Sequence, residues 1–334
     1  MTTDDRKIAL VLGATGGVGG EMARALLRHG WRVRALARNP ETAPPLPGAE
    51  WVKGDALDRG SVVAAAAGVS VIVHAVNPPG YRNWAGLVLP MIDNTIAAAA
   101  AVGGARIVLP GTIYNYGPDA FPLLSERSPQ NPATRKGAIR VELERRLEKA
   151  SAFGVPSLIL RCGDFVGPRP GNGWFHQGLV TPGRPVRSVA YPGPGELGHA
   201  WAYLPDVGET TARLLAMEAD LAPFATFHMA GHWLEHGIEM AEAISRAVGD
   251  PDIPVKTMPW RLMSLAAPFN ETVRELLEMR YLWREPLRLD NRRLVALIGE
   301  EPHTPLDAAV RATLEGIGCL PAPQNQPAAR RAFA

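Results

Sequence analysis

The chain has 334 residues, of which 46% are apolar and 20% charged, a composition typical of folded globular proteins and too apolar for a disordered one. Its 35 basic and 33 acidic side chains leave a net charge of +2, too small to indicate a nucleic acid or an anionic membrane as partner. Cys162 and Cys319 are too few for a disulfide framework or a structural zinc site. The acidic start and the lack of an apolar run of about 18 residues predict a cytoplasmic protein without a membrane span.

Short β-branched segments alternate with segments of helical period over the first 165 residues. Strands are expected at residues 7–12, 31–37, 51–53, 71–74, 106–109 and 157–160. Helices are expected at residues 17–29, 58–66, 87–102 and 134–152. This alternation predicts parallel strands joined by right-handed crossovers, that is, an α/β fold with a doubly wound, Rossmann-like parallel sheet.

The pattern changes after residue 161. Residues 163–198 are rich in glycine and proline, and one further strand is expected near residues 226–229. Helices are expected at residues 238–248, 270–279, 291–298 and 306–314. We therefore expect a first domain over residues 1–165, completed by the strand near 226–229, and a smaller, loop- and helix-rich C-terminal lobe over residues 166–320. Residues 321–334 show no period and are expected to be a mobile tail.

The strongest motif is the glycine pattern of residues 13–19, GATGGVG, which follows a buried strand and opens a helix. Gly13 permits a tight turn, Gly16 lets backbone N–H groups approach a diphosphate, and Gly19 lets the helix pack close to the sheet. The N-terminus of the helix then offers unpaired donors and a partial positive charge to the phosphates. The first domain is therefore expected to bind a dinucleotide, and the C-terminal lobe a substrate.

The G-x-x-G-x-x-G spacing resembles the short-chain dehydrogenase/reductase superfamily, in its extended and atypical branches, which include the NAD-dependent epimerases and dehydratases. Further segments resemble that superfamily in the expected order over about residues 6–315. They are GDALD at 54–58, VHA at 73–75, GTIYNYGP at 111–118, LRCGDFVGP at 160–168 and WAYLPDV at 201–207. The resemblance implies cofactor contacts from Gly13, Thr15, Gly16, Gly17, Val18, Gly19, Arg38, Asp55, Ala56, Leu57, His74, Ala75, Val76, Gly111, Lys136, Cys162 and Gly163.

The end of the second strand indicates which nicotinamide cofactor binds. Sites that prefer NAD place a carboxylate there for the ribose 2′-hydroxyl, and residues 33–39 contain none. Arg38 lies just past the strand, where a guanidinium can bind a 2′-phosphate through two hydrogen bonds. The alternative is an arginine that is merely solvated. We expect NADP rather than NAD.

The helix at 134–152 lacks the Tyr-x-x-x-Lys pair that most members of the superfamily carry. Aligning Glu144 with the glutamate that usually follows places Lys136 at the tyrosine position and Arg140 at the lysine position. This Lys-x-x-x-Arg arrangement resembles the isoflavone-reductase-like and NmrA-like members, where a lysine is the proposed catalytic base. Residues four apart share a helix face, so the fixed charge of Arg140 disfavours a second cation at Lys136. Lys136 is then expected to move a proton or to bind the nicotinamide ribose; the alternative is a charged, solvated helix face.

Three hydroxyl groups at the end of the fifth strand are further candidates for catalysis. The resemblance places Thr112 at the catalytic serine or threonine, where its hydroxyl binds a substrate oxygen. Tyr114 and Tyr116 follow, and either phenol is a candidate to replace the missing proton donor. The alternative is a turn threonine and buried structural tyrosines.

Six polar and aromatic side chains are candidates for a substrate pocket, although the aromatic ones fit the core of the C-terminal lobe equally well. They are Asn77, Asp164, Trp174, His176, Tyr191 and Trp201. His228, His232 and His236 recur every four residues, but Gly231 and Gly237 interrupt the run, so we expect no metal site.

These observations favour an NADP(H)-dependent oxidoreductase that transfers a hydride to or from a small organic carbonyl or enone. One alternative is a nucleotide-sugar epimerase or dehydratase with tightly held NAD; another is an NADP(H)-sensing regulatory protein without turnover. The expected partner is a small-molecule substrate, with no nucleic acid and no membrane. The resemblance also implies a homodimer that forms through the helices at 87–102 and 134–152.

Overall fold

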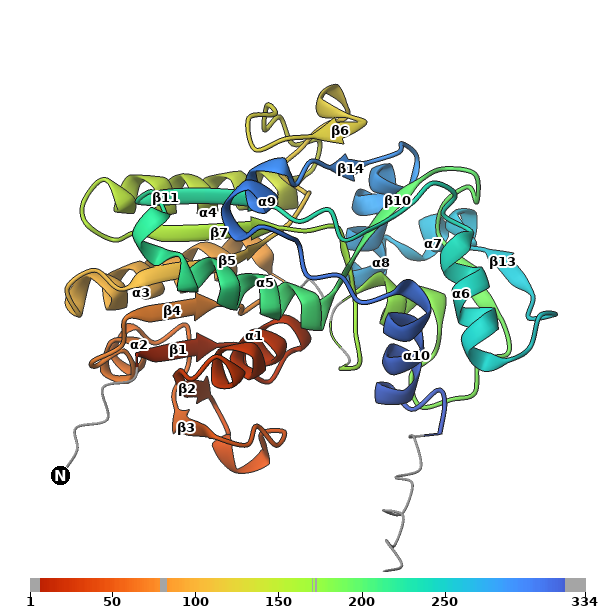
Figure 1. The fold of residues 1–334 in the computed structure, drawn as a ribbon. Coiled ribbons are helices and arrows are strands. Elements are labelled where there is room, and N and C mark those ends of the chain that lie inside the picture. The colour runs from red at the N-terminus through yellow and green to blue at the C-terminus, as the bar shows by residue number, and fades with distance from the viewer. Residues whose placement is uncertain (1–6, 79–82, 170, 172, 322–334) are drawn as a thin grey trace, which may run out of the picture.

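The computed structural model describes residues 7–78, 83–169, 171 and 173–321. Its centre is a seven-stranded sheet in which every described pairing is parallel, and the strand order is β11-β7-β5-β4-β1-β2-β3 (Figure 1). The strands are β1 (Ile8–Leu12), β2 (Arg32–Ala37), β3 (Ala49–Lys53), β4 (Val71–His74), β5 (Arg106–Gly111), β7 (Ser157–Arg161) and β11 (Phe224–His228). The prediction of a doubly wound, Rossmann-like α/β fold is confirmed.

The chain reverses its direction of travel across the sheet at β1. From β1 it goes to β2 and β3 on one side, and then to β4, β5, β7 and β11 on the other. Leu12, the last residue of β1, pairs with Leu36 of β2 and His74 of β4. The carboxyl ends of β1 and β4 therefore border a crevice at the topological switch point, where doubly wound sheets bind ligands.

Helices cover both faces of the sheet. On one face α1 (Gly17–Arg28) packs against α5 (Leu204–Ala216), and on the other α2 (Arg59–Ala65), α3 (Trp84–Ala101) and α4 (Arg135–Ser151) lie side by side. The side chains of Asp58 and Thr134 cap α2 and α4 by accepting hydrogen bonds from N–H groups of the first turn. The helix α5 was not predicted.

Helix α3 is long and apolar enough to cross a membrane by length and composition alone, with a mean hydropathy of 1.3. Asp93, Asn94 and Thr95 interrupt its apolar residues, so the helix is not a continuous apolar run. In the fold, Val88, Ile92 and Ala99 of α3 are buried, and the helix packs on α2, α4 and the sheet. Helix α3 is thus a layer of the α/β sandwich.

The C-terminal lobe lies beyond the carboxyl ends of the central strands, at the right of Figure 1. It contains a small sheet of β8 (Asp164–Val166), β10 (His199–Tyr203) and β12 (His232–Leu234), the pair β9 (Val189–Tyr191) and β13 (Val255–Thr257), and the pair β6 (Leu123–Leu124) and β14 (Arg288–Leu289). Its helices are η4 (Phe175–Leu179), α6 (Glu239–Val248), α7 (Trp260–Ala266), α8 (Glu271–Glu278), η6 (Met279–Trp283) and α10 (Leu306–Gly316).

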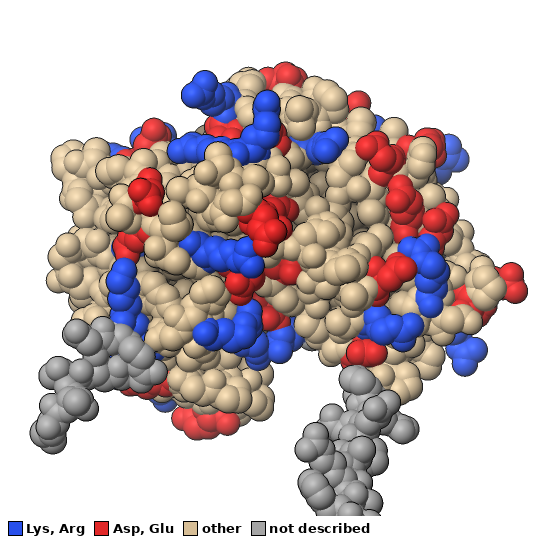
Figure 2. Space-filling model, viewed as in Figure 1, with Lys and Arg blue, Asp and Glu red and all other residues tan. Residues whose placement is uncertain are grey.

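The remaining helices are η1 (Pro40–Thr42), η3 (Pro118–Ala120), η5 (Glu218–Asp220) and α9 (Arg292–Ile298). Helix α9 packs on β11 and α5, so the chain returns to the first domain after the lobe. The tail predicted at 321–334 lies, from residue 322 on, outside the described residues. On the face in Figure 2, basic and acidic side chains are intermingled.

Candidate functional site

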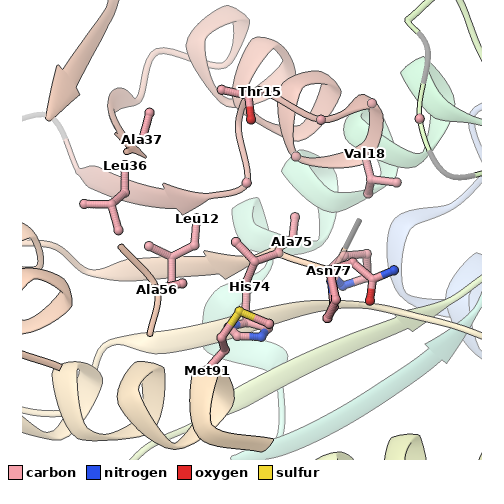
Figure 3. A pocket seen from close by; sticks show the side chains of 18 of the residues that line it. Leu12, Thr15, Val18, Leu36, Ala37, Ala56, His74, Ala75, Asn77 and Met91 are labelled. Carbon is pink, nitrogen blue, oxygen red and sulfur yellow. The ribbon is translucent and has the colours of Figure 1, made fainter. Parts of the chain in front are cut away.

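A cavity of about 650 Å³ follows the carboxyl ends of β1, β2, β4 and β5. In Figure 3, Thr15 and Val18 reach it from the glycine loop, Ala37 from β2, and His74 and Asn77 from the end of β4. Its wall also includes Leu12, Leu36, Asn39, Thr42, Ala43, Pro44, Gly54, Pro78, Trp84, Leu87, Met91, Pro110, Phe165, Gly171, Gly173 and Leu204. The cavity is therefore shared between the first domain and the first segments after β7.

The glycine loop has the shape that a diphosphate requires. Gly13 has a φ of +90°, and a Cβ atom there would lie 2.4 Å from the carbonyl oxygen of Ala75. A Cβ atom at Gly19 would lie 2.4 Å from the carbonyl oxygen of Gly13. Gly16 is the N-cap of α1 and has no side chain to occupy the N–H groups of the first turn. These N–H groups are thus available to an anion in the cavity.

The cavity wall as a whole carries more positive than negative charge. Arg38 lies just past β2, and Asp55 is the one acidic residue among the described residues that line the cavity. Its Oδ1 atom accepts a hydrogen bond from the N–H of Leu57, 3.0 Å away, so this carboxylate shapes its own turn. With Arg140 at the other end, the wall has two arginines and one aspartate.

His74 is a neutral, buried part of the wall. Its Nδ1 atom lies 2.8 Å from the hydroxyl of Thr95, which itself donates to the carbonyl of Met91, so Nδ1 carries the proton. Burial lowers the pKa of His74 to about 3, and the nearby charge of Arg140 acts in the same direction. His74 therefore does not supply a positive charge at neutral pH.

Lys136 and Arg140 of α4 both lie against Trp84, but only Arg140 lines the cavity. Trp84 lines the cavity as well, and Arg140 lies over its ring at 5.1 Å from the centroid. The Nζ atom of Lys136 lies 5.9 Å from the same ring and 3.8 Å from Oε2 of Glu278 in α8. Lys136 is only 1% exposed and is not part of the cavity wall.

Comparison with known proteins identifies the first half of the chain. Residues 13–150 match the family model described as NAD(P)H-binding. The 3-diazoavenalumate denitrifying reductase of a Streptomyces species is 32% identical over 186 residues, which cover 51% of this chain and 59% of the relative. The NmrA-like family domain-containing oxidoreductase notA of Aspergillus sp. (strain MF297-2) is 45% identical over 73 residues, 20% of this chain and 22% of the relative. The matches thus span less than two thirds of the length of these curated relatives.

The whole fold has counterparts among solved structures. UDP-glucose 4-epimerase from Brucella ovis in complex with NAD has a TM-score of 0.74 to this chain, covers 93% of it and 98% of its own length, and is 15% identical. At this identity the likeness concerns the fold. The chain thus shares the fold of the epimerases over most of its length, and its residues 13–150 match the NAD(P)H-binding family.

The residues of the cavity wall fit a nicotinamide dinucleotide. The backbone of the glycine loop at Gly13 and Gly19, called the cradle below, leaves space that a side chain would fill. Two buried polar atoms in the cavity wall, Oδ1 of Asn77 and Nδ1 of His176, have no hydrogen-bond partner among the described residues. A ligand with hydrogen-bond donors would satisfy both.

Most of the predicted cofactor residues line the cavity. They are Gly13, Thr15, Gly16, Gly17, Val18, Gly19, Arg38, Asp55, Ala56, Leu57, His74, Ala75 and Val76. Gly111, Cys162 and Gly163 lie outside the wall, as Lys136 does. A Cβ atom at Gly111 would lie 2.7 Å from Cγ of Arg161, so this glycine permits close packing inside the protein. Cys162 is 1% exposed, and burial raises the pKa of its thiol.

The structure brings Thr112, Tyr114 and Arg140 together at the cavity and places Tyr116 elsewhere. Tyr116 is fully buried, and its hydroxyl lies 2.9 Å from both Nε2 of His228 and Nη1 of Arg161. Burial raises the pKa of this phenol. Tyr116 is thus part of a buried polar network rather than a proton donor facing the cavity.

Of the predicted substrate residues, Asn77 and His176 line the cavity and four do not. Asp164 accepts a hydrogen bond from His199 at 2.8 Å. The other three, Trp174, Tyr191 and Trp201, pack edge-on around Trp283. These side chains form the core of the C-terminal lobe, which is the alternative that the sequence left open. Within the described ranges, no three His, Cys, Asp or Glu side chains are grouped to hold a metal ion.

Sequence reasoning missed several residues of the wall, above all Trp84, Phe165 and Leu204. Trp84 is the first residue of α3, three residues before the helix that the sequence predicts. Because it follows the carboxyl end of β4, its position in the chain could have indicated that it lines the cavity. Leu204 follows the WAY segment of the resemblance and closes over Gly17, whose Cβ atom would lie 2.9 Å from its Cδ1. No local pattern marks Phe165 as a cavity residue.

Proposed function

We propose that this protein is an NADP(H)-dependent oxidoreductase that transfers a hydride to or from a small organic carbonyl or enone. The observation that carries the proposal is one continuous cavity with two different ends. One end has the glycine cradle and Arg38, and the other has Thr112, Tyr114 and Arg140. A dinucleotide in the cradle extends toward the polar groups of β5 and α4.

Arg38 supports NADP as the cofactor. It lines the cavity just past β2, where NAD-preferring sites hold a carboxylate. The nearest acid in the wall, Asp55, accepts a hydrogen bond from its own turn. A guanidinium in this position favours the dianionic 2′-phosphate over a hydroxyl.

The chemistry at the other end follows from the charges there. Bound NADPH supplies the hydride, and the substrate oxygen then needs one proton. Thr112 accepts a hydrogen bond from the N–H of Tyr114 at 3.4 Å, which leaves its hydroxyl proton for a substrate oxygen. Arg140 stabilises negative charge on that oxygen but cannot release its own proton. We therefore assign the proton to the phenol of Tyr114, and Lys136 to a supporting position against Trp84.

The regulatory reading remains the second candidate, because Lys136 lies outside the cavity wall. The epimerase reading ranks lower, since the epimerases share only the fold and the wall at β2 has no carboxylate for NAD. Loss of NADPH absorbance in the presence of a panel of carbonyls and enones supports the oxidoreductase. Binding of NADPH without turnover on any of them supports the regulatory protein.

The cofactor assignment is tested by titration calorimetry with NADPH and NADH. Arg38→Ala is expected to weaken NADPH binding about tenfold or more and to leave NADH binding unchanged, as expected for loss of a charged hydrogen-bonding group. Arg28 lies in the last turn of α1, at the end of the helix away from the glycine loop. Arg28→Ala is therefore the matched control and is expected to leave both affinities unchanged. Equal affinities of the wild-type protein for NADPH and NADH refute the preference.

A further inference from the structure

His176 is a buried histidine that faces the cavity from the single π-helical turn η4. It is 5% exposed, lines the cavity, and is flanked by the ring of Phe175, whose centroid lies 5.8 Å from its own. The proposed mechanism gives this side chain no role.

The protonation state of His176 follows from its neighbours. Its Nε2 atom lies 3.0 Å from the carbonyl oxygen of Gly167, which only accepts hydrogen bonds, so Nε2 carries a proton. Burial lowers the pKa of the ring, outweighing the opposite effect of the Gly167 carbonyl, so the ring is neutral at pH 7. Nδ1 is therefore a bare acceptor, and it has no partner among the described residues.

The position of His176 relative to the glycine loop limits which donor can reach it. A Cβ atom at Gly173 would lie 3.6 Å from Nδ1 of His176, and one at Gly171 would lie 3.9 Å from the N atom of Gly17. His176 thus belongs to the segment that covers the start of α1. The adenosine end of the cavity, marked by Arg38, is on the β2 side of β1, whereas the turn η4 that carries His176 packs on β8 of the C-terminal lobe. The group next to the diphosphate on the side away from adenosine is the nicotinamide ribose, which carries two hydroxyl donors.

We propose that Nδ1 of His176 accepts a hydrogen bond from a hydroxyl of the nicotinamide ribose. The inference rests on the proposed function, because it requires a nicotinamide dinucleotide in the cradle. It also explains how the ribose is held although Lys136, the residue expected to bind it, lies against Trp84 and Glu278. His176 is then a positioning residue that fixes the ribose, and with it the face of the nicotinamide ring.

A matched pair of variants tests this assignment. Asn and Leu have the same shape, and both lose the bond to Gly167, but only Asn places an acceptor oxygen where Nδ1 of His176 stands. Titration calorimetry with NADPH, NADP⁺ and adenosine 2′,5′-bisphosphate compares wild type, His176→Asn and His176→Leu. We expect His176→Leu to bind NADPH and NADP⁺ about five- to tenfold more weakly than His176→Asn, the effect of one neutral hydrogen bond.

The bisphosphate serves as the internal control, because it carries the adenosine end and no nicotinamide ribose. Its affinity is expected to be the same in all three proteins. Equal NADPH affinity of His176→Asn and His176→Leu overturns the assignment, while bisphosphate binding shows that the cradle is intact. Failure of the wild-type protein to bind NADPH refutes the proposed function itself. If His176→Leu does not fold, His176→Phe, which fills the space of the ring, takes its place in the comparison.

Discussion

The buried ion pair between Glu144 of α4 and Arg161 of β7 offers a direct test of what holds α4 against the sheet. Nη2 of Arg161 lies 2.5 Å from Oε2 of Glu144, and its Nε lies 3.2 Å from Oε1. Arg161 is 1% exposed and Glu144 is 4% exposed. The other hydrogen-bond partners of Arg161, Tyr116 and His228, are both neutral groups, since burial raises the pKa of the phenol and lowers that of the imidazole to about 3. Glu126 adds a further negative charge nearby, but it makes no ion pair with Arg161 among the described residues.

Glu144→Ala removes the one carboxylate that pairs with this guanidinium among the described ion pairs. Removal of one partner of a buried pair costs about 3–5 kcal/mol, because the other charge stays buried without compensation. We expect a loss of that size in the free energy of unfolding. Glu144→Leu combined with Arg161→Met removes both charges and is expected to recover most of the loss.

Urea unfolding followed by tryptophan fluorescence measures these differences. Glu142→Gln on the same helix is the control, since the ion pairs of Glu142 with Arg145 and Arg146 are partly solvent-exposed and contribute little. A loss below about 1 kcal/mol for Glu144→Ala, or a double variant no more stable than the single one, would refute the reasoning.

Two further predictions concern the cavity and acid stability. Gly13→Ala is expected to lower NADPH affinity at least tenfold by calorimetry, because its Cβ atom would lie 2.4 Å from the carbonyl oxygen of Ala75 at a φ of +90°. The pKa values of His74 and His228 are lowered to about 3, so their stabilising contribution is complete above about pH 6.5 and is lost as the pH falls toward 3. From pH 7 to pH 5.5 we expect each histidine to lower the free energy of unfolding, measured with urea, by about 1.3 kcal/mol, and a stability unchanged over that range contradicts the assignment.

The central sheet could be predicted because its strands are buried on both faces. Residues 8–12, 71–73 and 158–160 are continuous apolar runs, and such runs indicate parallel strands without any knowledge of their neighbours. The cap of α2 is equally local, because Asp58 accepts hydrogen bonds from N–H groups two and three residues later.

Helix α5 escaped prediction because buried polar side chains interrupt its apolar period. Thr210 and Thr211 are fully buried, and the hydroxyl of Thr211 donates to the carbonyl of Val207 at 2.8 Å. The helix packs closely on α1, since a Cβ atom at Gly208 would lie 2.6 Å from the carbonyl oxygen of Glu21. A threonine that satisfies its hydroxyl within the helix, as Thr211 does, can occupy a helix interface, but its side chain looks polar in a sequence. The hydroxyl of Thr210 has no hydrogen-bond partner among the described residues.

In the candidate site, too, one end depends on residues that are close in the sequence and the other on contacts between distant segments. At the adenosine and diphosphate end, recognition depends on backbone geometry, on Gly13 and Gly19 above all, and a short motif carries that geometry. At the other end, side chains from separate segments decide the outcome. Lys136 shares a helix with Arg140, yet Glu278 of α8 lies 3.8 Å from its Nζ atom and only Arg140 reaches the cavity wall. The chemistry of this end is therefore set by how the C-terminal lobe packs on α4, and local helix spacing on α4 alone does not determine it.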